Sequence, residues 1–156
     1  MQNTMQAANL LMQEAISTAG FHLLQSRAEG GMFETGGVKF AWKNELNESD
    51  GTVRAVTVWC SVGTLEAQEN AELLERVLEM NLFGTEVRGG HLGLYAPTRA
   101  LVYSYRLKPW EEDRETTAAT LTAYTESAAG IMFEIREKAA SAAQNVPLFG
   151  SSMLWV

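Results

Sequence analysis

The sequence predicts an α+β fold, in which helices pack on a mostly antiparallel, twisted sheet in the order α-β-β-β-α-β-β-α. Two observations support this prediction. Apolar residues recur with helical spacing in residues 4–19, 66–80 and 116–143, and they alternate with polar residues between these segments. Polar or glycine-rich turns separate neighbouring alternating stretches, as in antiparallel hairpins. A chain of 156 residues that is 46% hydrophobic can build one core without a metal or a disulfide.

The first helix is expected at residues 4–19, and Gly20 fits the left-handed residue that commonly follows a helix. Residues 21–25 form a short apolar segment, to which we assign no strand. Glycine pairs then flank a weak strand at residues 32–34. The apolar residues of the helix share one face: Met5, Ala8, Met12, Ala15, Ile16 and Ala19.

Two antiparallel strands are expected next, at residues 38–42 and 52–62, around a polar turn at residues 47–51. Cys60 alternates with valines in the second strand, so we expect it to be a buried small hydrophobe. Because it is the only cysteine, it cannot form an internal disulfide. This cysteine usage favours a reducing cytoplasm as the compartment.

Trp59 is the large aromatic residue of the same strand, and alternation places it on the face opposite Val56 and Val58. An aromatic side chain of this size requires cover. The cover is a helix of the same protein, if the faces are reversed, or a second subunit. Otherwise Trp59 belongs to an exposed patch that binds a partner.

The second helix is expected at residues 66–80, with Asn81 marking its end. Alternating strands at residues 91–95 and 101–107 flank a turn at residues 96–99 and form a hairpin. Glutamates occupy the solvent side of the helix, opposite one apolar stripe. The stripe consists of Leu73, Leu74, Val77, Leu78 and Leu82.

The third helix is expected at residues 116–143, and the chain beyond it is apolar. We therefore expect one domain at residues 1–146 and an apolar tail at residues 147–156. The tail either docks on its own subunit, a second subunit or a partner, or frays. Burial of half its apolar side chains would contribute several kcal/mol at roughly 25 cal/mol per Å², which favours docking.

The chain is acidic, with 19 acidic and 12 basic residues and a net charge of −7. Its long-range field repels nucleic acids and anionic lipids and favours a partner with a basic or amphipathic segment. No apolar run approaches the roughly 20 residues of a membrane span, and the N-terminus lacks the pattern of a signal peptide. We therefore expect a soluble protein without membrane insertion.

The sequence offers no candidate catalytic, cofactor-binding or metal-binding residues. His22 and His91 lie far apart in the sequence, and neither has a second ligand at metal-binding spacing. The many carboxylates are explained by solvated helix surface and by the positive end of the third helix. A lone buried cysteine is a poor nucleophile, and no Gly-x-Ser-x-Gly motif occurs. An enzyme is not expected.

Residues 73–107 resemble the type III secretion chaperones of the Tir chaperone family. The resemblance consists of an acidic amphipathic helix ending in Asn-Leu, a short loop, Gly-x-Leu-Gly-Leu, a turn, and an alternating strand ending in Arg-Leu. The predicted element order also matches the family order across nearly the whole chain.

The resemblance implies a small acidic homodimer in the cytoplasm of a bacterium with type III secretion. Such a chaperone keeps one or several effector proteins soluble and competent for export, without catalysis and without ATP. The N-terminal segment of the effector wraps the dimer in extended form, presses apolar side chains into grooves and adds a strand to a sheet edge. Components of the secretion apparatus such as the ATPase are further candidate partners.

The family pattern also implies two sets of contact residues in this sequence. Its two-fold contact, on the second helix, corresponds to Leu74, Val77, Leu78 and Leu82. Its client site, on the first helix and first strands, points to Val38, Phe40, Trp42 and Trp59, without separating groove from core.

The chain departs from the family pattern in the glycine-rich residues 29–37 and in the apolar tail. The register of the first strand and the end of the domain are therefore open. The alternative function is that of a regulatory interaction protein of the same fold, which binds another chaperone or a secretion regulator.

Overall fold

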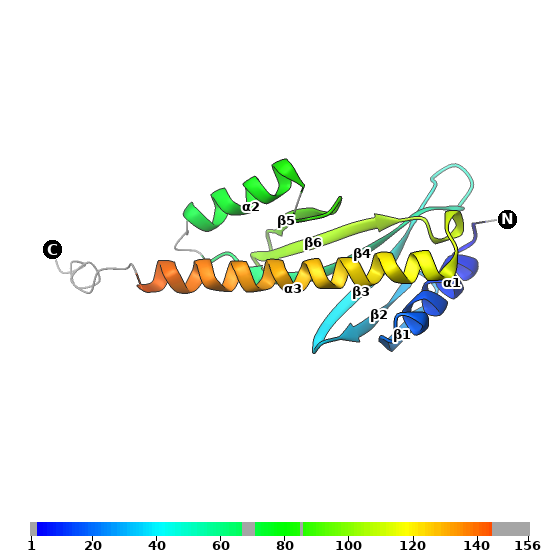
Figure 1. Ribbon diagram of the computed structural model, residues 1–156. Helices are drawn as coiled ribbons and strands as arrows, with labels where there is room; N and C mark the ends of the chain where they lie inside the picture. The colour runs from blue at the N-terminus through cyan, green and yellow to red at the C-terminus, as the bar shows by residue number, and fades with distance from the viewer. Residues whose placement is uncertain (1–2, 67–70, 85, 145–156) are drawn as a thin grey trace.

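A computed structural model of the chain describes residues 3–66, 71–84 and 86–144, and the tail expected at residues 147–156 lies outside this range. All strand pairs are antiparallel, and the six-stranded sheet has the order β1-β2-β3-β4-β6-β5 (Figure 1). The predicted α+β class is confirmed. The elements are α1 (Met5–Thr18), β1 (His22–Arg27), β2 (Gly30–Thr35), β3 (Val38–Leu46), β4 (Val53–Thr64), α2 (Ala71–Phe83), β5 (His91–Tyr95), β6 (Ala100–Leu107), the short 3-10 helix η1 (Pro109–Glu111) and α3 (Arg114–Gln144).

The first group of strands has one strand more than the sequence pattern indicated. The apolar segment at residues 21–25 overlaps β1, and the weak strand at residues 32–34 is the centre of β2. β1 is an edge strand whose residues are mostly exposed, and its register shifts between Leu23 and Gln25. A strand with little burial and a bulge has no clear alternation, which explains why its sequence does not identify it.

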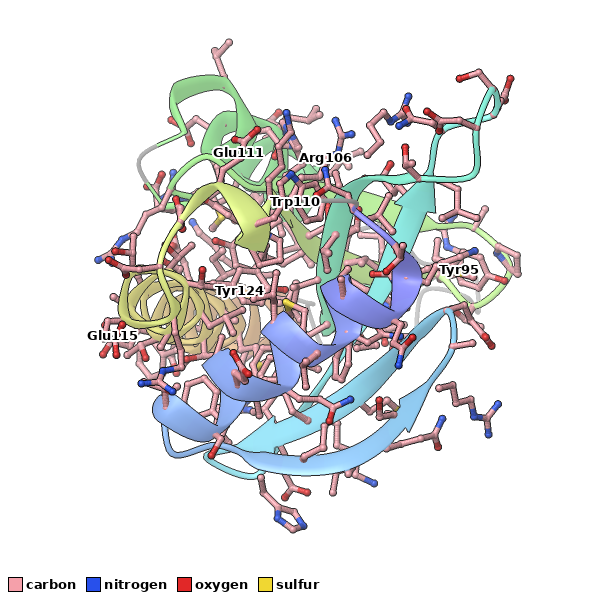
Figure 2. All side chains as sticks on the ribbon, turned by 90° about the vertical axis from the view of Figure 1, so that its right-hand side faces the viewer. Tyr95, Arg106, Trp110, Glu111, Glu115 and Tyr124 are labelled. Atoms are coloured by element: carbon pink, nitrogen blue, oxygen red, sulfur yellow. The ribbon has the colours of Figure 1, made fainter. Side chains whose placement is uncertain are left out.

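Two helices cover one face of the sheet. α1 and α3 pack against each other on the same side, and α3 crosses β4 (Figures 1 and 2). Tyr124 of α3 lies between the helix and the sheet, where its ring stacks on that of Tyr103 with centroids 4.7 Å apart. Phe33 and Phe40 stack beside them at 5.2 Å. We call the opposite side of the sheet, on which no described helix lies, the open face.

The predicted burial along β4 is confirmed. Val56, Val58 and Cys60 are buried under the helices, whereas Trp59 is half-buried on the open face. The helix starts also follow from local sequence. Thr4 Oγ1 accepts a 3.1 Å hydrogen bond from the Ala7 amide at the start of α1, and Asp113 Oδ1 accepts one of 2.6 Å from the Thr116 amide at the start of α3.

Asn81 does not end α2, contrary to the sequence expectation, because the helix continues to Phe83. The side chain of Asn81 instead binds the backbone of β5. Its Nδ2 donates to the Leu92 carbonyl at 2.7 Å, and its Oδ1 accepts from the Leu92 amide at 2.8 Å. Because the Asn81 side chain hydrogen-bonds the amide and the carbonyl of Leu92, it does not compete for the backbone groups of α2, and the helix continues past it. None of the helices within the described ranges is long and apolar enough to cross a membrane.

Candidate protein-binding surfaces

Most of the large apolar side chains that are exposed in the described ranges belong to two pairs of elements. Leu10 is exposed on α1, and Leu23 and Leu24 are exposed on β1, the strand that α1 contacts. On α2 and β5, the exposed residues are Leu74, Leu78, Leu82, Leu94 and Tyr95. Exposed apolar clusters of this kind mark surfaces that bind other proteins.

The first surface is a groove of about 520 Å³ between α1 and β1. Gln13 Nε2 on the helix donates a 2.7 Å hydrogen bond to Ser26 Oγ on the strand, and this pair forms part of the wall. We call it the α1–β1 groove, and its lining residues are Met5, Gln6, Asn9, Leu10, Gln13, Ser26 and Ala28.

Asn9 forms the floor of the α1–β1 groove. Its Nδ2 donates to the carbonyls of Arg27 and Ala28, both at 2.8 Å. Its Oδ1 accepts hydrogen bonds of 3.1 Å from Trp42 Nε1 and Asn44 Nδ2. One buried amide therefore ties α1 to the end of β1 and to β3, and it keeps the groove walls in place.

The edge of the sheet beside this groove is available for a further strand. Within the described ranges β1 pairs with β2 on one side and with no strand on the other. An edge strand presents unpaired N–H and C=O groups that can bind an extended peptide. The groove and the edge together can bind one segment through both its side chains and its backbone.

The second surface is on α2, whose apolar residues lie on two sides of the helix. Leu73, Val77 and Met80 are buried in the core. Leu74, Leu78 and Leu82 recur every four residues and are 39%, 60% and 74% exposed. We call these three residues the α2 stripe. On neighbouring β5, Tyr95 points to the side of the sheet away from α3 (Figure 2).

Arg76 holds α2 in this orientation. Its guanidinium forms ion pairs with Glu134 of α3, with Glu86 at 2.7 Å and with Glu79 at 3.3 Å. The hydrogen bond with Glu134, followed by that with Glu86, raises the pKa of Arg76. The bond from Arg76 lowers the pKa of Glu86 below 4.5. Both shifts favour the ionised forms of Arg76 and Glu86, and the ion pairs tie α2 to α3 with its buried side toward the core.

The residues expected to contact partners divide into buried and exposed sets in the structure. Phe40 and Trp42 are each 2% exposed, and in the core the Phe40 ring stacks on Phe33 while the Trp42 ring lies tilted beside it. Val38 is half-buried and packs against the same core. Trp59 is the member of the set that lies on the open face. Among the residues expected at a two-fold contact, Val77 is buried, and the other three form the α2 stripe.

Leu10 is a candidate contact residue that the sequence reasoning missed. It lies off the face shared by Ala8, Met12 and Ile16, which are buried. The sequence feature that could have identified it is a large apolar residue outside the apolar stripe of the helix. Leu24, at the bulge of β1, had no comparable signal because no strand was assigned there.

Two titratable groups of the core, the Cys60 thiol and the Tyr103 hydroxyl, are held in their neutral forms by burial. Burial raises the pKa of the Cys60 thiol to about 11 and that of the Tyr103 hydroxyl to about 12. Both groups are neutral at physiological pH, so neither can act as an anionic nucleophile. The described part of the chain contains no group of three or more His, Cys, Asp or Glu side chains that could hold a metal ion.

Comparisons with known proteins identify the family and the fold of this chain. Residues 53–132, about half of the chain, match the Tir chaperone protein (CesT) family. No match occurs among curated proteins.

Two solved structures from Pseudomonas aeruginosa share the fold. One is the heterodimeric complex ExoU-SpcU from the type III secretion system, with a TM-score of 0.59, 10% identity, and coverage of 80% of this chain and 93% of that chain. The other is the ExoT-SpcS complex, with a TM-score of 0.51, 14% identity, and coverage of 85% and 97%.

Proposed function

Because this chain belongs to the Tir chaperone protein (CesT) family, it is a type III secretion chaperone, and we propose that it binds the N-terminal segments of effector proteins in the bacterial cytoplasm. Binding keeps the effector soluble and competent for export. Family membership implies a binding role rather than catalysis.

The observation that supports this proposal most directly is the α1–β1 groove beside an unpaired strand edge. An extended client segment can add a strand to β1 and place an apolar side chain against Leu10. Each fully buried leucine-sized side chain contributes about 1.5–3 kcal/mol, and each backbone hydrogen bond about 0.5–1.5 kcal/mol. A few such contacts hold an unfolded segment without any chemical step.

The proposed active form is a homodimer whose two-fold contact is the α2 stripe. A two-fold interface buries the same surface on both subunits, so the α2 stripe of one subunit would cover the α2 stripe of the other. Leu94 and Tyr95 on β5 would extend the contact beyond α2. Val77 is excluded from it because the core of its own subunit already buries this side chain.

Two features beyond the described surfaces complete the proposal. The division into a domain at residues 1–146 and an apolar tail at residues 147–156 stays a prediction from the sequence, since the tail lies outside the described residues. The secretion ATPase is a further candidate partner of the loaded chaperone. The alternative, a regulator of the same fold that binds another chaperone, is less favoured, because the solved structures that share this fold are named as complexes with ExoU and ExoT.

Pull-down with truncated effectors tests the proposal. We expect an effector to bind through its N-terminal segment and not through its folded domains. Leu10→Asp should weaken binding at least about tenfold, because it places a charge in the groove. Leu46→Asp, at an exposed leucine outside both surfaces, is the matched control and should bind normally. Equal binding by Leu10→Asp and wild type would refute the groove.

A further inference from the structure

The open face of the sheet has an apolar centre. Trp59 on β4 lies directly across from Ala41 on β3, and Ala41 lies across from Met32 on β2. A hollow of about 250 Å³ lies at this position, and its charged lining residues are Arg27, Lys43 and the carboxylate of Glu29. A hollow of this size can receive one leucine-sized side chain from a bound chain.

The charge around this hollow is opposite to the charge of the whole protein. Arg27, Lys39 and Lys43 are exposed, and within the described ranges their charged groups form no ion pair. Glu34 lies across from Lys39 in the sheet register, without an ion pair between them in the same ranges. Glu45 is already paired, because its carboxylate contacts Arg106 and Arg54. Within the described ranges, the unpaired cations Arg27, Lys39 and Lys43 therefore outnumber the unpaired carboxylates Glu29 and Glu34 around the hollow.

Most of the acidic residues that produce the net charge of −7 lie elsewhere. Glu72, Glu75 and Glu79 are exposed on α2, and Glu111 lies on η1. At physiological salt, charges interact over about 8 Å, so the potential at the hollow depends on these nearby groups, among which cations are in excess, more than on the acidic residues of α2. The net charge favours basic partners at long range, but the open face favours an acidic one on contact.

The spacing of the lysines specifies what kind of segment fits. Lys39, Ala41 and Lys43 are alternate residues of β3 and project to the same face. Lys39 and Lys43 are four residues apart, or roughly 13 Å along the strand at 3.3 Å per residue. An extended client chain has the same repeat. A carboxylate two residues to each side of an apolar residue can therefore reach one lysine each.

We propose that the open face binds an extended acidic client segment of the pattern acid-x-apolar-x-acid. The apolar side chain enters the hollow beside Trp59, and the flanking carboxylates pair with Lys39 and Lys43. This inference rests on the proposed chaperone function and adds a second contact to the α1–β1 groove. Of the alternatives considered for Trp59, the inference selects the last, an exposed patch that binds a partner.

The test uses the peptide acetyl-Ser-Gly-Glu-Ser-Leu-Ser-Glu-Gly-Ser-amide and the full chain, observed by the NMR signal of the Trp59 indole N–H. The acidic peptide should shift this signal, and the analogue with both glutamates replaced by lysine should not. Lys39→Gln combined with Lys43→Gln should weaken binding about tenfold, the effect of losing two exposed ion pairs of ordinary strength. Arg114→Gln combined with Arg136→Gln removes the same charge from α3 and should leave binding unchanged.

Three results would overturn the inference. These are no shift with the acidic peptide, equal binding of both peptides, and an equal loss in the α3 control variant. Self-association that the lysine variant abolishes would also overturn it, because a second copy would then occupy the face. A pull-down in parallel separates the two proposals. An effector that binds while the peptide does not leaves the chaperone function intact, whereas absence of any effector binding contradicts that function.

Discussion

The indole nitrogen of Trp42 on β3 donates a 3.1 Å hydrogen bond to the side-chain oxygen of Asn9 on α1, and both residues are buried. A single contact thus joins the first helix to the centre of the sheet. It also explains why the floor of the α1–β1 groove is polar in an otherwise apolar core, since the amide serves four partners at once.

Asn9→Ala should destabilise the protein by about 2–4 kcal/mol, because it leaves Trp42 Nε1 without its partner in the core and Asn44 Nδ2 with only a 3.5 Å hydrogen bond to the Ala28 carbonyl. Urea unfolding measures this change. The control is Gln13→Ala, which removes an exposed hydrogen bond one turn further along and should change stability by less than about 0.5 kcal/mol. Similar midpoints for the two variants would contradict a structural role for Asn9.

Gly31→Ala should destabilise the protein by about 2–3 kcal/mol through overpacking. A Cβ at this position would overlap the Trp42 ring and the Gln25 carbonyl, so β1 or the indole must move. Gly93→Ala on β5 is the matched control, since a Cβ there meets nothing within 4 Å. Urea unfolding of both variants tests the expectation, and it fails if the two glycines tolerate alanine equally.

Leu78→Asp should convert the proposed homodimer into a folded monomer, because Leu78 is exposed on its own subunit and would be buried only at the two-fold contact. We expect the dissociation constant to rise at least about thirtyfold, as for a central interface residue. Sedimentation at micromolar concentration measures it. Val77→Asp should instead unfold the subunit, because Val77 is in the core. A wild-type protein that sediments as a 17.2 kDa particle would rule out the dimer.

Cys60 should react with a disulfide reagent at pH 8 at least about one hundred times more slowly in the folded protein than in urea. Burial raises its pKa to about 11, whereas an unfolded thiol has a pKa near 8.5, so the thiolate is scarce as well as shielded. The reaction has one site because the chain has one cysteine. Equal rates with and without urea would show that the β4 region opens readily.

Glu45 should make stability fall in acid. Burial, the largest single influence, raises its pKa, but hydrogen bonds from Thr57 and Arg106 and the charges of Arg106 and Arg54 together hold the pKa below 4.5. Folding therefore favours the ionised form. Its contribution is fully present above pH 4.5 and is lost as pH falls through the lower folded pKa.

Urea midpoints of wild type and Glu45→Gln, measured from pH 6 down to pH 3, test this expectation. The difference between the two proteins should shrink toward acid. Glu14→Gln, at an exposed position on α1, is the control. A difference between wild type and Glu45→Gln that stays constant with pH would contradict the assignment.

The local pattern of the sequence was sufficient for most elements of the fold. The stripe of Met12, Ala15 and Ile16 predicted α1, and the alternation around Cys60 predicted β4 and its buried face, which the structure confirms. β1 escaped prediction because an edge strand with a bulge buries few side chains and therefore shows no alternation.

By itself, the sequence determined which residues share a face, because the periods of helix and strand follow from backbone geometry alone. Only the tertiary structure decided which face is covered. Phe40 and Trp42 are core residues because α1 and α3 pack over them, and Trp59 remains accessible because no described helix lies on its side. The leucines of α2 divide into buried and exposed sets because Arg76 ties that helix to Glu134 of α3. Such contacts join residues far apart in the chain, and no local period encodes them.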